Sequence, residues 1–449
     1  MIALPRYKLN VGDQLTYRTT CASDGERQSN GSGRSSPFAV EWNFYVIARD
    51  ANGAWRIVFS ESRAPEDEFA LGEGAAHRID CDGFFDMDDD GRMIENWTIT
   101  PLANPTVVFP RLPADHSEIA SGWHSTLEFD LTNCRYAATS ADAATEQSIW
   151  QFASECHTQF DPVYQVLRQR DYVFDLKRGL VTRIGTAFQR GAPASTDDAA
   201  GRDFVHLVDV TTRAGFDSTL ARQEADRYFE RCGEYQRLVD LAFWDLPQAS
   251  HWFAKAADVL AGFERVVSVD FIGEFVRRKL ALHKRECAGM LSDADKLAPL
   301  IGARAPEWHA VDLEGNTHTT QGHGGKVLVL CFWNRGCTWS LRALLAVNAL
   351  ANEMRGRPIT FLSVSADRNI DEAAYACQAL KIGLPTIMDV SSARALSAVY
   401  GVDSYPTTIV IDQNGIIQRV RAGYSHRLSS TLALELRRLV HEESCVSCD

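Results

Sequence analysis

The sequence lacks the features that would place it in a membrane or on a nucleic acid. No stretch approaches the roughly 18 consecutive apolar residues of a membrane-spanning helix. The first residues, MIALPRYKLNVGDQLTYRTT, lack the basic start, apolar centre and cleavage site of a signal peptide. No long basic run offsets a formal net charge of -13, so phosphate groups would be repelled. As written, the chain predicts a soluble cytoplasmic protein whose partners are neither nucleic acids nor membranes.

The cysteines lack the arrangement of a disulfide framework. There are 11 of them, an odd number, scattered and mostly in apolar or strand-like surroundings. We expect most to be buried free thiols. The histidines do not cluster with cysteines at zinc spacing, and we expect neither a metal nor a cofactor. The stretch from Asp86 to Gly91 begins like a calcium loop but has Trp97 in place of the final glutamate, which favours a hairpin turn.

Hydrophobic periodicity divides the 449 residues into several parts, in keeping with their number. Residues 7–213 alternate with period two between turn signals, which indicates a mainly antiparallel β domain, either a curved sheet or a sandwich. From Asp217 onward the period becomes about 3.6, which indicates a helical module. The prediction is a multidomain α+β chain: a β-rich domain of unknown function at 1–215, the helical module at 216–300, an α/β domain at 301–441 and a cysteine-containing tail at 442–449.

Strands and helices alternate in the α/β part. The apolar runs Val327–Phe332 and Ile359–Ser365 flank a helical pattern at 338–354, which is the signature of a βαβ crossover. Further elements follow along the chain: helices at 370–380, 392–400 and 428–440, and strands at 408–412 and 415–422.

Cys337 falls at the junction between loop and helix in this βαβ unit. Unpaired backbone N–H groups and the positive end of the helix dipole stabilise an anion at such a position. A thiol there can lose its proton more readily, and the thiolate is the nucleophile. The alternative is that Cys337 is a small residue filling a turn.

Residues 303–440 resemble the TlpA-like thiol-disulfide oxidoreductases, which are thioredoxin-fold redoxins of the alkyl-hydroperoxide-reductase/thiol-specific-antioxidant (AhpC/TSA) superfamily. The family's opening Gly-x-x-Ala-Pro is matched by residues 302–306, and its Phe-Trp-x-x-x-Cys by residues 332–337. Its later Tyr-Gly-Val-x-x-x-Pro-Thr-x-x-x-Ile-Asp is matched by residues 400–412. The resemblance covers just under a third of the chain. It implies a thioredoxin fold and a site that contains Trp333, Cys337, Tyr405 and Pro406.

The resemblance also implies that the Tyr405-Pro406 peptide bond is cis and packs against Cys337. Its backbone would offer hydrogen bonds to an extended peptide or to a mixed disulfide. The partner would then be a protein or a small molecule that carries a thiol or a disulfide. The sequence does not indicate the oligomeric state.

Ser340 marks the main departure from this family. The usual motif is Cys-x-x-Cys, whereas this chain has Cys337-Thr338-Trp339-Ser340, so no adjacent thiol resolves a mixed disulfide. The glutamate that many relatives carry six residues past the first cysteine is replaced by Ala343. The threonine that peroxiredoxins place three residues before their cysteine is replaced by Asn334.

Other thiols could take over the resolving role. Cys331 lies on the preceding strand, at the position where thioredoxins bury an aspartate, and is alternatively a core residue. Cys445 and Cys448 form the one C-x-x-C of the chain and could reach back to Cys337. Alternatively, that tail is a disordered terminus or a weak metal-binding end. Cys377 is expected in the core.

The leading hypothesis is a thiol-disulfide oxidoreductase that uses Cys337 alone to form mixed disulfides. An external thiol, Cys331 or the tail would complete the cycle. Two alternatives stay open. One is a non-catalytic binding or scaffold module with a residual Cys337, and the other is a peroxidase that forms a sulfenic acid at Cys337.

Overall fold

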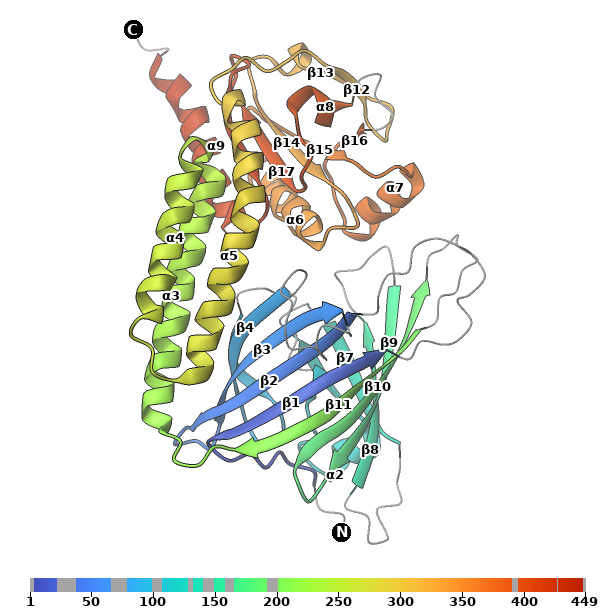
Figure 1. Cartoon of the computed structure of the whole chain (residues 1–449). Coiled ribbons are helices and arrows are strands. Elements are labelled where there is room, and N and C mark those ends of the chain that lie inside the picture. Colours follow the sequence, from blue (N-terminus) through green and yellow to red (C-terminus); the bar gives the residue numbers. More distant parts are fainter. Residues whose placement is uncertain are drawn as a thin grey trace. The chain divides into compact units, whose positions relative to one another are not determined.

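The computed structural model describes residues 4–21, 38–65, 79–98, 107–127, 132–139, 149–157, 165–191, 201–389, 395–425 and 427–446. The chain forms two compact units, shown with all their elements in Figure 1. The first contains Met1–Cys232 and Ala261–Leu282, and the second contains Gly233–Leu260 and His283–Asp449. Both helices and several sheets are present, as the sequence predicts.

The first unit is built on a curved 11-stranded sheet in which every pair of neighbours is antiparallel (Figure 1). Its order is β5-β4-β3-β2-β1-β11-β10-β9-β8-β7-β6, so the first and last strands of the segment pair in the middle. The sequence pattern left open a curved sheet or a sandwich, and the structure has one continuous sheet. The strands are β1 (Asp13–Cys21), β2 (Phe38–Arg49), β3 (Trp55–Pro65), β4 (Ile79–Met87), β5 (Met93–Thr98), β6 (Trp123–Leu127), β7 (Thr132–Ala138), β8 (Ile149–His157), β9 (Gln165–Asp175), β10 (Leu180–Gly191) and β11 (Gly201–Thr212); the short helix α2 (His116–Ser121) precedes β6.

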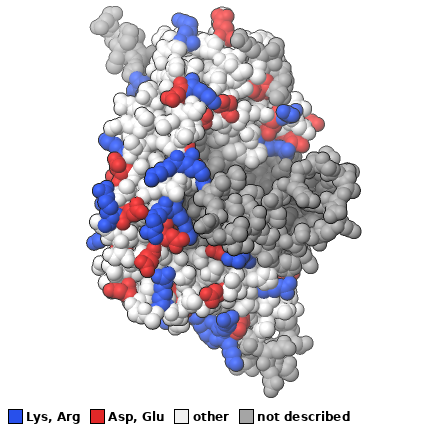
Figure 2. All heavy atoms as spheres, in the orientation of Figure 1, with Lys and Arg blue, Asp and Glu red and all other residues white. Residues whose placement is uncertain are grey.

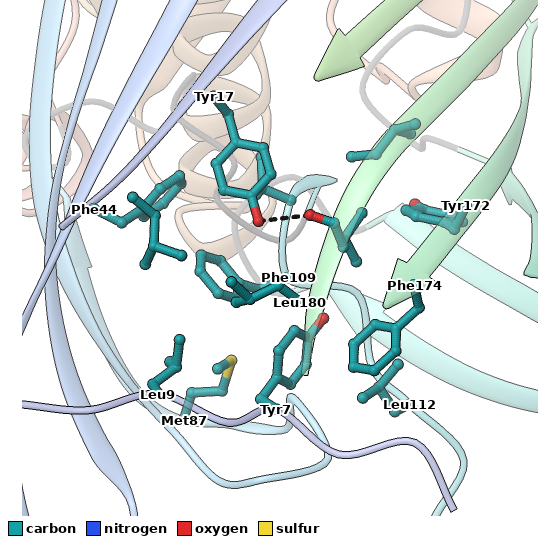
Figure 3. Packing of buried hydrophobic residues seen from close by; sticks show 14 of the residues in the cluster. Tyr7, Leu9, Tyr17, Phe44, Met87, Phe109, Leu112, Tyr172, Phe174 and Leu180 are labelled. Carbon is teal, nitrogen blue, oxygen red and sulfur yellow. Dashed lines mark hydrogen bonds between the residues drawn. The ribbon is translucent and has the colours of Figure 1, made fainter. Parts of the chain in front are cut away.

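An aromatic core fills the concave side of this sheet. Inward-pointing side chains recur every second residue, as period-two strands require. Figure 3 shows Phe109 among rings and aliphatic side chains from several strands, with its centroid 4.9 Å from that of Phe44. The Tyr17 hydroxyl donates a hydrogen bond of 2.8 Å to the Val181 carbonyl, which satisfies its polar atom inside the core (Figure 3).

The stretch from Asp86 to Gly91 forms the predicted hairpin turn between β4 and β5. The backbone N–H of Arg92 donates to carboxylate oxygens of Asp88 and Asp90, at 2.9 and 3.0 Å. A Cβ at Gly91 would lie only 2.7 Å from the Pro110 carbonyl oxygen, so this position requires glycine. In the described part of the chain, no group of three or more potential metal ligands gathers. The side chain of Trp97 lies outside the described residues.

Cys134 of β7 is disulfide-bonded, which the cysteine pattern did not predict. In the sheet register it lies opposite Cys156 of β8. Among the cysteines whose side chains are described, five are free, namely Cys232, Cys287, Cys331, Cys337 and Cys377. The expectation of buried free thiols fits Cys232, Cys331 and Cys377.

The helical segment contains α3 (Ser218–Trp244), α4 (Ala249–Glu264) and α5 (Asp270–Leu297), with 3-10 turns at Leu246–Gln248 and Ala298–Leu300. Asp217 accepts a hydrogen bond of 3.0 Å from the Leu220 N–H, where the sequence predicts the helix start. The sequence predicts a separate module here, whereas the residues of the three helices are divided between the two units. In the described ranges, every helix is too short or too polar to cross a membrane.

The second unit contains a five-stranded sheet with the order β16-β15-β14-β17-β18. β14 pairs with β15 and β15 with β16 in parallel, whereas β17 and β18 are antiparallel additions. The predicted strands and helices of this part are present with shifts at their ends. The largest is at α9, which continues to Val446, whereas the sequence predicts a tail from residue 442; the predicted helix start at residue 392 lies outside the described residues. The strands are β14 (Val327–Trp333), β15 (Ile359–Ser365), β16 (Thr386–Met388), β17 (Thr407–Ile411) and β18 (Ile417–Ala422); the helices are α6 (Thr338–Glu353), α7 (Ile370–Ala379), α8 (Leu396–Tyr400) and α9 (Leu428–Val446); a small sheet consists of β12 (His309–Val311) and β13 (Thr317–Thr319), followed by a 3-10 turn at Gln321–His323.

All seven residues of the central strand β14 are buried. Helices α6 and α9 pack on β14, and Leu396 and Tyr400 of α8 lie in one cluster with Leu330 and Phe332. A strand covered on both faces needs a continuous apolar run, and this explains the sequence VLVLCFW.

Acidic and basic side chains are interspersed on the face drawn in Figure 2. The parts of that face drawn in colour carry neither an extended basic area nor an extended acidic one.

Candidate redox site

Cys337 caps the N-terminus of α6, directly after the loop that follows β14. Its backbone is extended, with φ -109° and ψ 111°, while Thr338 begins the helix. The thiol is free and partly exposed. Residues 334–337 therefore place the cysteine where the first N–H groups of a helix point, as the sequence predicts.

The end of the neighbouring strand holds this loop in place. The Asp367 carboxylate accepts two hydrogen bonds from the Arg335 N–H, at 3.2 and 3.1 Å, and one of 2.9 Å from the Ser365 hydroxyl. The Arg335 side chain forms an ion pair with Glu372 of α7. Because β14 and β15 are parallel, their carboxyl ends meet at one edge of the sheet, and Asp367 can reach the loop.

A cis peptide bond joins Tyr405 and Pro406, as the family resemblance implies. The Cys337 sulfur lies 3.8 Å from the Tyr405 carbonyl oxygen. The Pro406 carbonyl accepts a hydrogen bond of 2.7 Å from the Gly423 N–H, which ties this loop to the end of β18. The structure thus brings Cys337, Tyr405 and Pro406 together.

Trp333 and Ser340, which precede and follow Cys337 in the sequence, are both fully buried. Among the described residues, neither the Trp333 indole nitrogen nor the Ser340 hydroxyl has a hydrogen-bond partner. The Ser340 hydroxyl therefore does not bond to the Cys337 sulfur. A buried hydroxyl without a partner is costly, so this position is one where a less polar side chain would fit better.

The region that contains Cys337 and the cis Tyr405-Pro406 bond is similar to a known protein family. Residues 301–420 match the model of the AhpC/TSA family. These matched residues are called the AhpC/TSA region below.

Two bacterial relatives match about the same region. The thiol-disulfide oxidoreductase ResA of Geobacillus thermodenitrificans (strain NG80-2) is 29% identical over 129 residues, which are 29% of this chain and 73% of ResA. The thioredoxin-like protein YneN of Bacillus subtilis (strain 168) is 26% identical over 124 residues, which are 27% of this chain and 71% of YneN. A crystal structure of a thiol:disulfide interchange protein of the thioredoxin family from Chlorobium tepidum TLS covers 31% of this chain and 97% of its own, with 17% identity and a TM-score of 0.28.

Within the AhpC/TSA region, Cys331 is poorly placed to resolve a mixed disulfide. It is fully buried in β14, and burial raises the pKa of its thiol to about 12, against a lowering effect from a hydrogen bond with Thr408. Cys377 is also in the core, as predicted, with its sulfur 3.5 Å from the Thr386 hydroxyl. Cys445 lies in α9 but its side chain is outside the described residues, and so is the whole of Cys448.

A row of polar side chains crosses the sheet of the AhpC/TSA region through Cys331. The strand registers align one residue from each of the five strands, namely Thr386, Ser363, Cys331, Thr408 and Arg421.

The row ends at Arg421, which is only 2% exposed and lies 3.4 Å from the Asp240 carboxylate of α3. Burial lowers the pKa of Arg421 and raises that of Asp240, while their mutual attraction opposes both shifts. Sequence reasoning did not find this pair.

An aromatic pair includes a residue of the first turn of α6. The ring of Trp339, the second residue after Cys337, stacks on that of Tyr424 at 5.8 Å and 26°. The Arg342 guanidinium lies 6.0 Å from the Trp339 ring centroid. Trp339, Tyr405 and Tyr424 are all partly exposed, so their rings offer apolar surface to a partner.

Proposed function

We propose that the protein is a thiol-disulfide oxidoreductase in which Cys337 is a single nucleophilic thiol. The observation that carries this proposal is the partly exposed Cys337 at the start of α6, 3.8 Å from the carbonyl oxygen of the cis Tyr405-Pro406 pair. The match of residues 301–420 to the AhpC/TSA family model and the likeness to ResA support the same chemistry. The partner is a protein or a small molecule with a thiol or a disulfide.

The proposed reaction is one thiol-disulfide exchange followed by a second. The Cys337 thiolate attacks one sulfur of a partner disulfide and forms a mixed disulfide. The other partner sulfur leaves as a thiolate with the electron pair of the broken bond and takes up a proton. A second thiolate then attacks the partner sulfur of the mixed disulfide and releases the Cys337 thiolate, so the protein is regenerated unchanged.

Ser340 determines which group can resolve the mixed disulfide. A hydroxyl cannot displace a thiolate under these conditions, so the neighbour that would close an internal disulfide is inert. The burial of Cys331 and the raised pKa of its thiol disfavour an attack from the strand. An external thiol completes the cycle, or the tail does so by attack of Cys445 or Cys448 on the mixed disulfide, which leaves a Cys445–Cys448 disulfide that two external thiols then reduce.

The test is the site of mixed-disulfide formation with glutathione disulfide, read by peptide mass spectrometry of the intact chain after digestion. We expect a glutathione adduct on Cys337 of the wild type and its loss in Cys337→Ser. Cys287 of α5 is the internal control, because it is also partly exposed but burial raises the pKa of its thiol. Labelling of Cys337 no faster than that of Cys287 would support a binding module with a residual cysteine.

The disulfide bond of Cys134 favours an oxidising compartment over the cytoplasm. Structural disulfides persist in exported proteins and are rare where glutathione keeps thiols reduced. In protein purified from its native host without reductant, we expect Cys134 to resist alkylation until a reductant is added. Full alkylation of Cys134 without a reductant would mean that the disulfide is absent in the native protein, which would contradict an oxidising compartment and favour the cytoplasm.

A further inference from the structure

Helix α3 reaches the redox site from outside the AhpC/TSA region. Its residues from Gly233 onward belong to the same compact unit as that region. The buried Asp240 carboxylate lies 3.4 Å from the Arg421 guanidinium at the end of β18 and also accepts a hydrogen bond from the Ser425 side chain. Asp240 thus holds both sides of the loop Gly423–Ser425.

The loop Gly423–Ser425 contacts both the cis Tyr405-Pro406 pair and the Trp339 ring. Its Gly423 N–H donates the 2.7 Å hydrogen bond to the Pro406 carbonyl, and its Tyr424 ring stacks on Trp339. A Cβ at Gly423 would lie 3.8 Å from the Phe243 ring, so the helix also packs against the loop backbone. Asp240 and Phe243 of α3 therefore contact the loop and its flanking residue, and the loop in turn contacts the cis bond and Trp339.

We propose that Asp240 and Phe243 are positioning residues for Cys337, and that they fix the surface on which an extended polypeptide partner lies. The inference rests on the proposed function and names its partner class. The Tyr405-Pro406 backbone and the Trp339 ring contact a partner only when that partner has a main chain and side chains around its cysteine. A small disulfide needs the Cys337 thiolate alone, so the position of the loop matters less to it.

Two mixed disulfides with the same leaving group separate these contributions. One joins thionitrobenzoate to the cysteine of a ten-residue peptide with apolar flanking residues, and the other joins it to 2-mercaptoethanol. Attack by Cys337 on the non-aromatic sulfur releases the coloured thionitrobenzoate anion in both cases. The rate measured with Cys337→Ser is subtracted as background. The ratio of the corrected peptide rate constant to the corrected 2-mercaptoethanol rate constant then measures how much contact with the surface accelerates the reaction of a peptide.

We expect Phe243→Ala and Asp240→Ala to lower the peptide rate about tenfold and to leave the small-disulfide rate within about twofold. Arg237→Gln is the matched control, since Arg237 is exposed on the same helix and its substitution should change neither rate. Phe243→Tyr keeps the ring and should restore the peptide rate. Asp240→Ala leaves the buried Arg421 without its carboxylate and can fail to fold, so Phe243→Ala, at a partly exposed position, is the deciding variant.

The outcomes distinguish this inference from the function on which it rests. An unchanged ratio in Phe243→Ala, with wild-type Cys337 reactive toward both disulfides, would overturn the positioning role and leave the oxidoreductase standing. Equal losses toward both disulfides would mean that Phe243 only maintains the fold, which also contradicts the inference. A wild-type Cys337 that reacts with neither disulfide would reject the proposed function itself.

Discussion

Replacement of Ser340 by alanine should stabilise the second unit. Ser340 is fully buried, and its hydroxyl has no hydrogen-bond partner within the described residues. A buried polar group without a partner costs about 1–3 kcal/mol. The void left by one oxygen atom opposes this gain by only a few tenths of a kcal/mol, at about 24 cal/mol per Å³ of cavity. Alanine also has a helix propensity about 0.5 kcal/mol better than that of serine. We therefore expect Ser340→Ala to raise the free energy of unfolding of this unit by about 1–3 kcal/mol.

The assay must report on the second unit alone, because a chain with two compact units is not expected to unfold in one step. Cys331 supplies this signal, since its buried thiol becomes reactive only when the sheet opens. Pulsed alkylation across a urea series, with Cys331 read by peptide mass spectrometry, gives the midpoint of that transition.

The control for helix propensity is Ser292→Ala, because Ser292 is exposed in α5 of the same unit. The difference between the two alanine variants isolates the cost of burying the Ser340 hydroxyl. If Ser340→Ala is no more stabilising than Ser292→Ala, or destabilises the unit, then the hydroxyl has a partner in solution and the reasoning fails.

Three further predictions follow from buried groups of the second unit. Asp240→Ala should destabilise it by about 3–5 kcal/mol because Arg421 is left buried and unpaired, whereas substitution of both residues by apolar ones should be nearly neutral in urea unfolding. Burial and the nearby His318 and Lys326 lower the pKa of His323 below its usual 6.5. As the pH falls, the unfolded chain therefore protonates this histidine at a higher pH than the folded chain does. Stability of the unit should consequently fall as the pH drops below about 6.5, and His323→Gln should flatten that decline in thermal unfolding at pH 5 and pH 7. In native buffer Cys331 should resist iodoacetamide while Cys337 reacts, and equal labelling of the two would contradict the described burial.

Local signals made much of the second unit predictable. β15 and the start of α6 lie where the sequence places them, because a fully apolar run and a change of period are visible in a single stretch of chain. The cis bond at Pro406 and its closeness to Cys337 followed from the family resemblance. Neither could have been found from local propensity.

Long-range pairing explains what the sequence did not predict. Asp240 and Arg421 are 181 residues apart, and neither carries a local pattern that names its partner. The alternation of residues 7–213 shows which side chains face the core but not the order of strands, so the pairing of β1 with β11 in one continuous sheet was not predictable. The division of the helices between two units likewise depends on contacts between residues far apart in the sequence, which local periodicity does not show.

The central claim is that Cys337 forms a mixed disulfide that Ser340 cannot resolve. The most direct test follows the glutathione adduct by intact mass after excess glutathione disulfide is removed, in a chain with wild-type Ser340 and in Ser340→Cys, both carrying Cys445→Ser and Cys448→Ser so that the tail thiols are absent. The account predicts a persistent adduct on wild-type Cys337 until an external thiol is added, and rapid release of glutathione from Ser340→Cys as its two neighbouring thiols close a disulfide. Equally persistent adducts in both proteins, or a wild type that never carries one, would contradict it.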